Sequence, residues 1–547
     1  MPEYINISEP LRCFRETITS LDQQFANLIC RLAGERSSEE LYLAAALASH
    51  LTLEGKQVCF DLAKAQAKQS LTEFFPNLFQ GHRQTDQEWM DILDTVPIPD
   101  NWQEKLIDSK MVAEASADKN MYKPLVLDKG KLYFNRYWQY EQDLTSSLLN
   151  KLKQNHLENH GPYQLKIKDL KQEILSVSCL FKGQDPDKIS LNQQFLAVQK
   201  ALNSYLTVIT GGPGTGKTTI VSAILAILLW HRPDLQIALC APTGKAQARL
   251  KESLIEEQAH LHCPDEVKER LLNLNPSTIH RLLGSKPNSI FFRHNLNHPL
   301  NIDLLIVDEV SMVSLPLMAK LMEAVPAPAG IILLGDKDQL ASIESGAVLA
   351  DICDSLPLVD GYERHDHKKN QGAGLVELRT SYRFREQGGI GKLKKLIEQG
   401  RGKEALDLLD SDQSGELEYR PLPNPRDLPF VLNDFVSNWA IETEDESVRF
   451  KDCLMSSPRA CSKSLDQAVS QAYAHFSRFR ILSPFRHGPF GIEYVNQVLR
   501  KIMGKTATYC HGLPIMVTSN DHVLNLYNGD IGLCWQDYDQ ALKVFFP

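Results

Sequence analysis

The sequence lacks three features that would point to particular classes of protein. Its eleven cysteines never form a C-x-x-C pair, which argues against a metal site built from cysteines. No apolar run reaches the roughly 18 residues that a membrane-spanning helix requires, and the longest candidate covers residues 220–230. Residues 1–5 do not begin a basic and then apolar signal peptide. We therefore expect a cytoplasmic protein with reduced thiols.

The chain also lacks an excess of positive charge. Its 547 residues include 59 Lys or Arg and 68 Asp or Glu, so the net charge is −9, which excludes a surface that is basic all over. A local basic groove stays possible, because nucleic-acid binding depends on where Lys and Arg cluster. The length allows about three or four domains.

One glycine-rich stretch organises the chain. Residues 207–219 read TVITGGPGTGKTT, so a short apolar run leads through the phosphate-loop pattern G-x-x-x-x-G-K-T into a run of helical length. Glycines allow the backbone to approach phosphate oxygens, and amides at a helix N-terminus attract them. We predict that a nucleoside triphosphate is bound by Gly211, Gly212, Pro213, Gly214, Thr215, Gly216, Lys217, Thr218 and Thr219.

A second apolar run ends in two carboxylates that would complete a hydrolytic site. Residues 304–307 are followed by Asp308 and Glu309. We expect Asp308 to hold Mg²⁺ through water, opposite the hydroxyl of Thr218, and Glu309 to act as the general base for the attacking water. Lys217 would add a full positive charge at the phosphates.

Further side chains are candidates around the nucleotide. Gln339 could sense the γ-phosphate, because an amide both donates and accepts hydrogen bonds, whereas Asp336 and Asp338 could instead only hold that loop. Arg383 or Arg379 could act as an arginine finger, with a surface salt bridge as the alternative for either.

Residues 192–194 (NQQ) precede the phosphate loop. Gln194 could read an adenine edge, and capping of a helix is an equal alternative for this segment.

Two segments could contact single-stranded DNA. Thr243, Gly244 and Lys245 follow an apolar run, and their hydroxyl, amide and ammonium groups suit a backbone phosphate. Thr278 and His280 could do the same, although His280 could also be a histidine of the core.

The apolar runs at residues 208–210, 237–241, 304–307 and 331–334 alternate with helical patterns. This alternation predicts a parallel, doubly wound α/β sheet, interrupted by a hairpin near residues 285–302. We expect two short strands at 124–128 and 131–138, with aromatic side chains that could stack bases but more often belong to a core. A second α/β region is expected from residue 375.

These motifs, in this order, resemble those of superfamily 1 helicases and, more closely, the RecD family of exodeoxyribonuclease V alpha subunits. The resemblance rests on residues 210–219, 241–246, 278–284, 307–312, 334–342, 381–384, 485–491 and 527–531, and more loosely on 43–50 and 132–136.

The resemblance implies two RecA-like domains, the second incomplete, that close on ATP and Mg²⁺. It implies a 5′→3′ motor on single-stranded DNA that acts in double-strand break repair, in a complex with RecB-like beta and RecC-like gamma subunits. The hairpin would split the strands. The implied parts are a helical docking domain (1–115), a connecting segment (116–188), motor domain 1A (189–360) and motor domain 2A (361–547) with a partial SH3-like barrel (512–547).

The family's Lys-Ser-Gln-Gly and Thr-Arg-Ala motifs do not occur in the sequence. We therefore keep an alternative function, a truncated subunit that binds ATP and assembles but does not move. Another phosphate-loop enzyme, such as an AAA-type ATPase or a nucleotide kinase, is disfavoured by residues 334–342 and 381–384.

Overall fold

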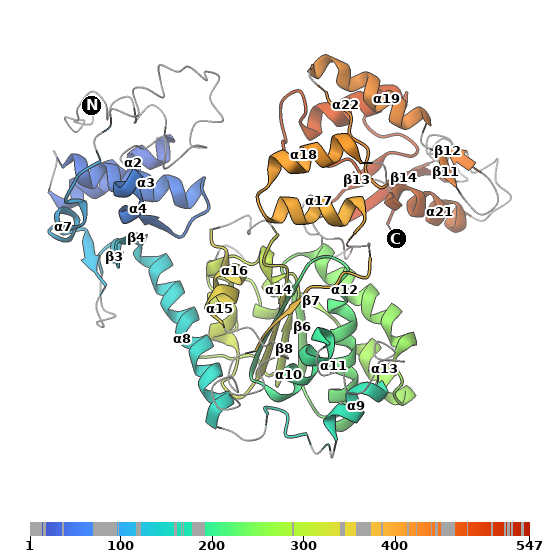
Figure 1. Ribbon diagram of the computed structural model, residues 1–547, viewed down its shortest axis with the longest axis horizontal. Helices are drawn as coiled ribbons and strands as arrows, with labels where there is room; N and C mark the ends of the chain where they lie inside the picture. The colour runs from blue at the N-terminus through green and yellow to red at the C-terminus, as the bar shows by residue number, and fades with distance from the viewer. Residues whose placement is uncertain are drawn as a thin grey trace. The chain divides into compact units, whose positions relative to one another are not determined.

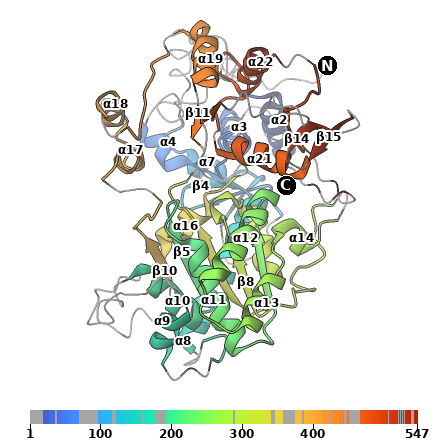
Figure 2. The same cartoon turned by 90° about the vertical axis from the view of Figure 1, so that its right-hand side faces the viewer.

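The computed structural model divides into two compact units, Met1–Arg385 and Glu386–Pro547 (Figures 1 and 2). The structure describes residues 14, 18–34, 38–68, 96, 98–115, 122–157, 161–165, 167, 169–177, 192–286, 289–339, 345–356, 374–383, 387–412, 415–422, 424–438, 440–442, 447–449, 465–478, 480–504, 507–518, 521, 524, 526, 529–537 and 541–546. Residues 182–188 and 363–369 lie outside the described residues, as do residues 527–528 of the motif at 527–531.

The N-terminal part of the first unit combines helices with a small sheet. Helix α3 (Glu39–Leu53) is buried from Leu41 to Thr52, so it is a core helix rather than an amphipathic one. It packs against α2 (Ser20–Ala33) and α7 (Trp102–Ile107), and α4 (Leu62–Lys68) follows soon after it in the chain. The sheet order is β1 (Cys59–Asp61), β4 (Lys131–Phe134), β3 (Leu125–Asp128) and β2 (Val112–Glu114).

This sheet adds strands to the N-terminal domain that we expected to be helical over residues 1–115. Strands β3 and β4 come from the predicted connecting segment, and β4 pairs with β1 and β3. The strand expected over 131–138 is shorter, because α8 (Asn135–Leu157) begins directly after Phe134. Tyr133 and Trp138 are buried, and Trp138 Nε1 donates to Asp128 Oδ2 at 3.1 Å. The core alternative for these aromatics is therefore the observed one.

The rest of the first unit is a six-stranded sheet in which every pair of strands is parallel. This confirms the predicted doubly wound α/β architecture. In spatial order the strands are β10 (Leu375–Leu378), β5 (Leu206–Gly211), β9 (Gly330–Gly335), β8 (Leu304–Val307), β6 (Ile237–Ala241) and β7 (Ser277–Thr278).

Helices cover both faces of this sheet, which explains why its strands are almost continuously apolar. Along β5, Ile209 packs into one core and Val208 into the other. The first core includes α9 (Leu170–Val177), α10 (Gln193–Asn203), α11 (Lys217–His231), α12 (Gly244–Glu257) and α13 (Asp265–Asn273). The second includes α8, α14 (Ile279–Leu283), α15 (Leu315–Ala324) and α16 (Val348–Ser355). Short 3-10 turns follow at η3 (Gln258–His260) and η4 (Val310–Met312).

Strand β10 shows that our expectation of a second α/β region starting near residue 375 was wrong. Leu375 lies opposite Val208 and Leu378 opposite Gly211, so β10 is the edge strand of the first sheet. The first sheet thus extends beyond residue 360. The hairpin expected near 285–302 appears as isolated bridges, Ser285–Phe292 and Asn295–His298, rather than as regular strands.

The second unit is described in separate pieces. A small core joins α19 (Leu428–Asn438) to α22 (Ile492–Ile502), and Trp535 packs against α21 (Leu465–Arg478). The other elements are α17 (Gly389–Glu398), α18 (Gly402–Ser411), η5 (Pro425–Asp427), the pair β11 (Ala440–Glu442) and β12 (Ser447–Arg449), and the antiparallel sheet of β13 (Pro514–Met516), β14 (Ile531–Gln536) and β15 (Leu542–Phe545).

That antiparallel sheet falls in the segment predicted as a partial SH3-like barrel. The described residues of the second unit contain no parallel sheet, so a second RecA-like domain stays a prediction. No helix in the described part of the chain is long and apolar enough to cross a bilayer.

Candidate active site

The phosphate loop connects β5 to α11, at the edge of the sheet where the parallel strands end. Gly214 and Gly216 have φ angles of +75° and +83°, which only glycine adopts readily. A Cβ atom at Gly214 would lie 2.4 Å from Cβ of Arg383, and one at Gly216 would lie 2.4 Å from Nε2 of Gln194. The two glycines are therefore required both by the backbone and by their neighbours.

Lys217 is the first residue of α11, and its ammonium group lies within the loop. Nζ donates to the carbonyl oxygens of Gly211 at 2.6 Å and Gly212 at 3.2 Å. Burial lowers the pKa of Lys217, while the negative charges of Asp336, Glu309 and Asp308 act in the opposite direction. The ammonium group therefore lies near these three carboxylates. This position suits a group that binds phosphate beside a metal ion.

Asp308 and Glu309 follow directly after β8. The amide of Asp308 donates to Cys240 O, and the amide of Glu309 donates to Asp308 Oδ1, both at 2.9 Å. Burial and the neighbouring Glu309 carboxylate raise the pKa of Asp308 to about 6. A bound cation would offset both effects. Carboxylate and hydroxyl oxygens are the ligands that Mg²⁺ prefers, so Asp308 and Thr218 are a donor set that suits this ion.

Glu309 itself adopts a left-handed conformation, with a φ of +52°. A non-glycine residue in this region typically costs about 1–3 kcal/mol and tends to occur at functional sites. This conformation turns the chain sharply between β8 and η4. The strain is consistent with a role of Glu309 in the reaction.

The loop after β9 is held by Asp336, which is 4% exposed. Its carboxylate accepts from the amide of Asp338 at 3.1 Å and from Nε2 of Gln339 at 3.3 Å, and the amide of Lys337 donates to Thr210 Oγ1 at 3.1 Å. Asp336 therefore holds the loop, as one of our alternatives predicted. Gln339 is exposed and stays a candidate γ-phosphate sensor.

Two residues of the segment 192–194 have different roles. The side chain of Asn192 caps α10 by accepting from the amides of Gln194 and Phe195, which is the capping alternative. Gln194 is buried, and its Nε2 donates to Thr215 O at 3.0 Å. In this structure the amide of Gln194 supports the phosphate loop, and adenine recognition by Gln194 stays a prediction.

Sequence reasoning missed the contacts that the segment after β10 makes with the phosphate loop. Ser381 Oγ donates to Pro213 O at 3.0 Å, and the amide of Tyr382 donates to Gly214 O at 2.8 Å. Arg383, which we expected to reach in from a second sheet, instead follows β10 of the first sheet and is exposed beside Gly214. No local signal could reveal these contacts, because they depend on the pairing of β10 with β5.

Arg379 forms the surface ion pair that we considered as an alternative, with Nε 3.1 Å from the Glu377 carboxylate. Lys337 also pairs with Glu377, at 2.7 Å. Arg383 is therefore the better candidate for an arginine finger.

The two candidate DNA-contacting segments lie side by side at the same edge of the sheet. In the β6–β7 pair, Ala241 is opposite Thr278. Thr243 caps α12 and Thr278 caps α14 through their hydroxyl groups. The core alternative for His280 is wrong, because this side chain is exposed and packs edge-on against Phe292, with ring centroids 5.8 Å apart.

Lys245 is also exposed, at the start of α12 beside Gly244. Its position leaves the ammonium group available to a phosphate.

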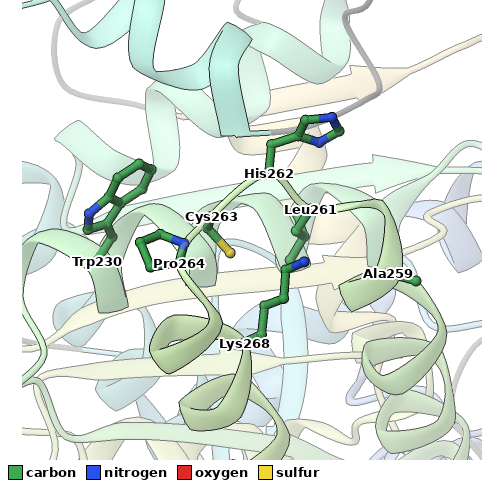
Figure 3. A pocket seen from close by; sticks show the side chains of 7 residues that line it. All are labelled: Trp230, Ala259, Leu261, His262, Cys263, Pro264 and Lys268. Atoms are coloured by element: carbon green, nitrogen blue, oxygen red, sulfur yellow. The ribbon is translucent and has the colours of Figure 1, made fainter.

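A pocket of about 600 Å³ opens at the opposite end of α11 (Figure 3). It is lined by Trp230 from α11, by His262 and Cys263, and by Lys268 from α13. Because α11 runs from Lys217 to His231, roughly 22 Å at 1.5 Å per residue, this pocket lies far from the phosphate loop and is not the nucleotide site. No group of three or more His, Cys, Asp or Glu suited to a metal occurs among the residues that the structure describes.

The sequence is similar to those of known proteins. Residues 194–345 match the family described as "AAA domain", and residues 15–133 match "RecBCD enzyme subunit RecD, N-terminal domain". RecD of Haemophilus influenzae is 32% identical over 493 residues, which cover 84% of this chain and 74% of that protein. RecD of Mycobacterium tuberculosis is 34% identical over 528 residues, which cover 94% and 76%.

The chain belongs to the RecD family. It is accordingly an ATP-dependent DNA helicase, as the order of the motifs predicted. A shorter match, 41% identical over 167 residues, covers 30% of this chain and 20% of the ATP-dependent RecD2 DNA helicase of Deinococcus radiodurans. Recognition as a RecD protein from the sequence is thus confirmed.

Proposed function

We propose that this chain is the 5′→3′ motor subunit of a RecBCD-like helicase and nuclease complex that processes DNA ends during double-strand break repair. One observation carries the proposal. The phosphate loop, the Asp308–Glu309 pair and the two candidate DNA-contacting segments all follow strands of one parallel sheet and share its carboxyl edge. ATP and single-stranded DNA would therefore bind to the same rigid element.

In this proposal each residue has a defined task. The loop amides and Lys217 hold the β- and γ-phosphates. Thr218 and Asp308 hold Mg²⁺, which neutralises charge that develops on the phosphates. Glu309 accepts a proton from the attacking water. Gln339 and Arg383 contact the γ-phosphate, and Gln194 borders the adenine.

The DNA backbone would contact five groups in these two segments, namely Thr243, the amide of Gly244, Lys245, Thr278 and His280. Such contacts fix position without reading sequence, as a translocating protein requires.

The matched relatives are named as subunits of RecBCD, and this supports beta and gamma subunits as partners. Family membership also favours the active motor over a subunit that binds ATP but does not move. The N-terminal match at residues 15–133 supports a docking role for that part of the chain.

ATP hydrolysis by the purified full chain, measured with and without oligo(dT), tests the proposal. We expect oligo(dT) to stimulate hydrolysis. Lys217→Ala should lower the stimulated rate by at least about a hundredfold, because the charge on the transferring phosphoryl group is no longer neutralised. Lys153→Ala, which alters an exposed lysine of α8, should match the wild type. Hydrolysis that does not respond to DNA would contradict a motor function.

Binding to DNA tests the second half of the proposal. Lys245→Ala should weaken oligo(dT) binding for every sequence and lower the slope of log Kd against log salt concentration by about one. An unchanged slope would remove Lys245 from the DNA interface.

A further inference from the structure

Helix α12 connects the two candidate binding sites. It begins at Gly244, directly after the Thr243 cap, and it ends at Glu257. At that far end, Thr219 Oγ1 of α11 donates to Glu257 Oε1 at 2.8 Å. Fourteen helical residues span roughly 21 Å. The helix α12 thus has the candidate DNA-contacting residues at its start and contacts the phosphate-loop helix at its end.

The middle of α12 is also tied to the nucleotide site. Leu250 and Leu254 are buried in the same core as α11, so the two helices pack together. Along α12, the first turn therefore adjoins the candidate DNA-contacting residues, and the last turn bonds to the phosphate-loop helix.

We propose that Glu257 is a positioning residue that transmits DNA binding at the start of α12 to the phosphate loop. Thr219 lies in the first turn of α11, next to Thr218 and two residues from Lys217. A movement of α12 would shift the Glu257 carboxylate, and the hydrogen bond would carry that shift to the turn that holds the phosphates and Mg²⁺. The inference rests on the proposed function, because it requires that both ligands bind where we place them.

Coupling of this kind is reciprocal, so it can be measured in two ways. DNA should change the rate of ATP hydrolysis, and a non-hydrolysable ATP analogue with Mg²⁺ should change the affinity for oligo(dT). If this hydrogen bond only joined two helices, its loss would lower stability and reduce basal and stimulated hydrolysis by the same factor. The ratio of stimulated to basal hydrolysis distinguishes the two roles.

The experiment compares three variants of the full chain with the wild type. Glu257→Ala removes the acceptor, and we expect stimulation by oligo(dT) to fall by at least about fivefold while basal hydrolysis stays within twofold. Glu257→Gln keeps an acceptor oxygen for Thr219 and should retain most of the stimulation. Glu256→Ala changes the exposed neighbouring carboxylate and should behave as the wild type.

The outcomes separate this inference from the proposed function. If the wild type responds to DNA and Glu257→Ala responds equally, or loses basal and stimulated hydrolysis by the same factor, the inference is overturned. If the wild type shows neither stimulation nor a nucleotide-dependent change in oligo(dT) affinity, the proposed function fails with it. Thermal unfolding of each variant shows whether Glu257→Ala is folded. If it is not, the Glu257→Asp variant, whose shorter carboxylate cannot keep the same contact, takes its place with the same expectations.

Discussion

Nε2 of Gln194 lies 3.0 Å from the carbonyl oxygen of Thr215, so the buried side-chain amide of this α10 residue donates a hydrogen bond to the phosphate loop. The same nitrogen would lie 2.4 Å from a Cβ atom at Gly216. Gln194 therefore lies so close to the loop that only a glycine fits at position 216, and its amide forms a hydrogen bond with the loop. The geometry of the loop therefore depends on Gln194, a side chain that lies outside the loop.

Gly216→Ala should weaken binding of an ATP analogue by more than about tenfold. The added methyl group meets Gln194, and alanine strains a φ of +83°. Titration calorimetry with the analogue and Mg²⁺ measures the affinity. Gly34→Ala is a matched control, because its φ is +77° but no atom lies within 4 Å of the new Cβ. Unchanged affinity in Gly216→Ala would show that the loop adopts another conformation when it binds nucleotide.

Glu309→Gln should lower the rate of ATP hydrolysis by about 10²–10⁴-fold, because glutamine cannot accept the proton of the attacking water. Binding of the ATP analogue should stay within threefold, since the amide of residue 309 still donates to Asp308 Oδ1. Glu323→Gln, on the surface of α15, provides the control. Wild-type hydrolysis in Glu309→Gln would assign the role of general base to another group.

Asp22→Asn should change how the stability of the protein depends on pH. Burial alone would raise the pKa of Asp22, but hydrogen bonds from His50, Ser49 and Thr19 outweigh burial and hold the pKa below its ordinary value of 3.8. A carboxyl group with a depressed pKa stabilises the folded state above that ordinary value, and the stabilisation is lost as the pH falls below it.

We therefore expect Asp22→Asn to be less stable than the wild type at pH 6, by about 1–3 kcal/mol, and the difference to shrink below pH 4. Urea unfolding followed by circular dichroism at a series of pH values measures it. A difference that does not vary with pH would mean that the charge of Asp22 contributes nothing.

Lys151→Met should destabilise the first unit. Nζ of Lys151 donates to three carbonyl oxygens, those of Pro326, Ala327 and Ala329, at 2.5–2.8 Å, and the side chain is buried. Methionine fills a similar volume but leaves these acceptors without a donor, at a cost of about 2–4 kcal/mol. Thermal unfolding of Lys151→Met beside Lys153→Met, its exposed neighbour on α8, measures the loss. Equal melting temperatures would contradict a role for Lys151 in docking α8.

The phosphate loop could be predicted because its signal is contiguous. Strand, glycine turn and helix follow one another in thirteen residues, and each follows from local preferences. The buried strands β8 and β9 could be predicted for the same reason, since their apolar runs are unbroken. Asp308 and Glu309 were then placed by the parallel arrangement alone.

Other features depend on contacts between distant parts of the chain. The four residues of β10 carry no sign of which sheet they join, and only the pairing with β5 places Arg383 beside Gly214. The end of β4 at Phe134 could not be predicted either, because aromatic residues suit both a strand and the helix that follows. The bond between Thr219 and Glu257 depends on the direction of α12, which no local pattern specifies.

The order of strands in the first sheet also has a consequence during synthesis. β5 lies between β9 and β10, and both of those strands leave the ribosome long after it. At roughly 5–20 residues per second, the chain from Gly211 to Leu378 takes about ten to thirty seconds to make. Throughout that interval the strand that bears the phosphate loop has an unpaired edge. The ATP site thus matures only after the last strand of this sheet has been made, and a nascent chain that ends before residue 375 lacks the strand that places Arg383 beside Gly214.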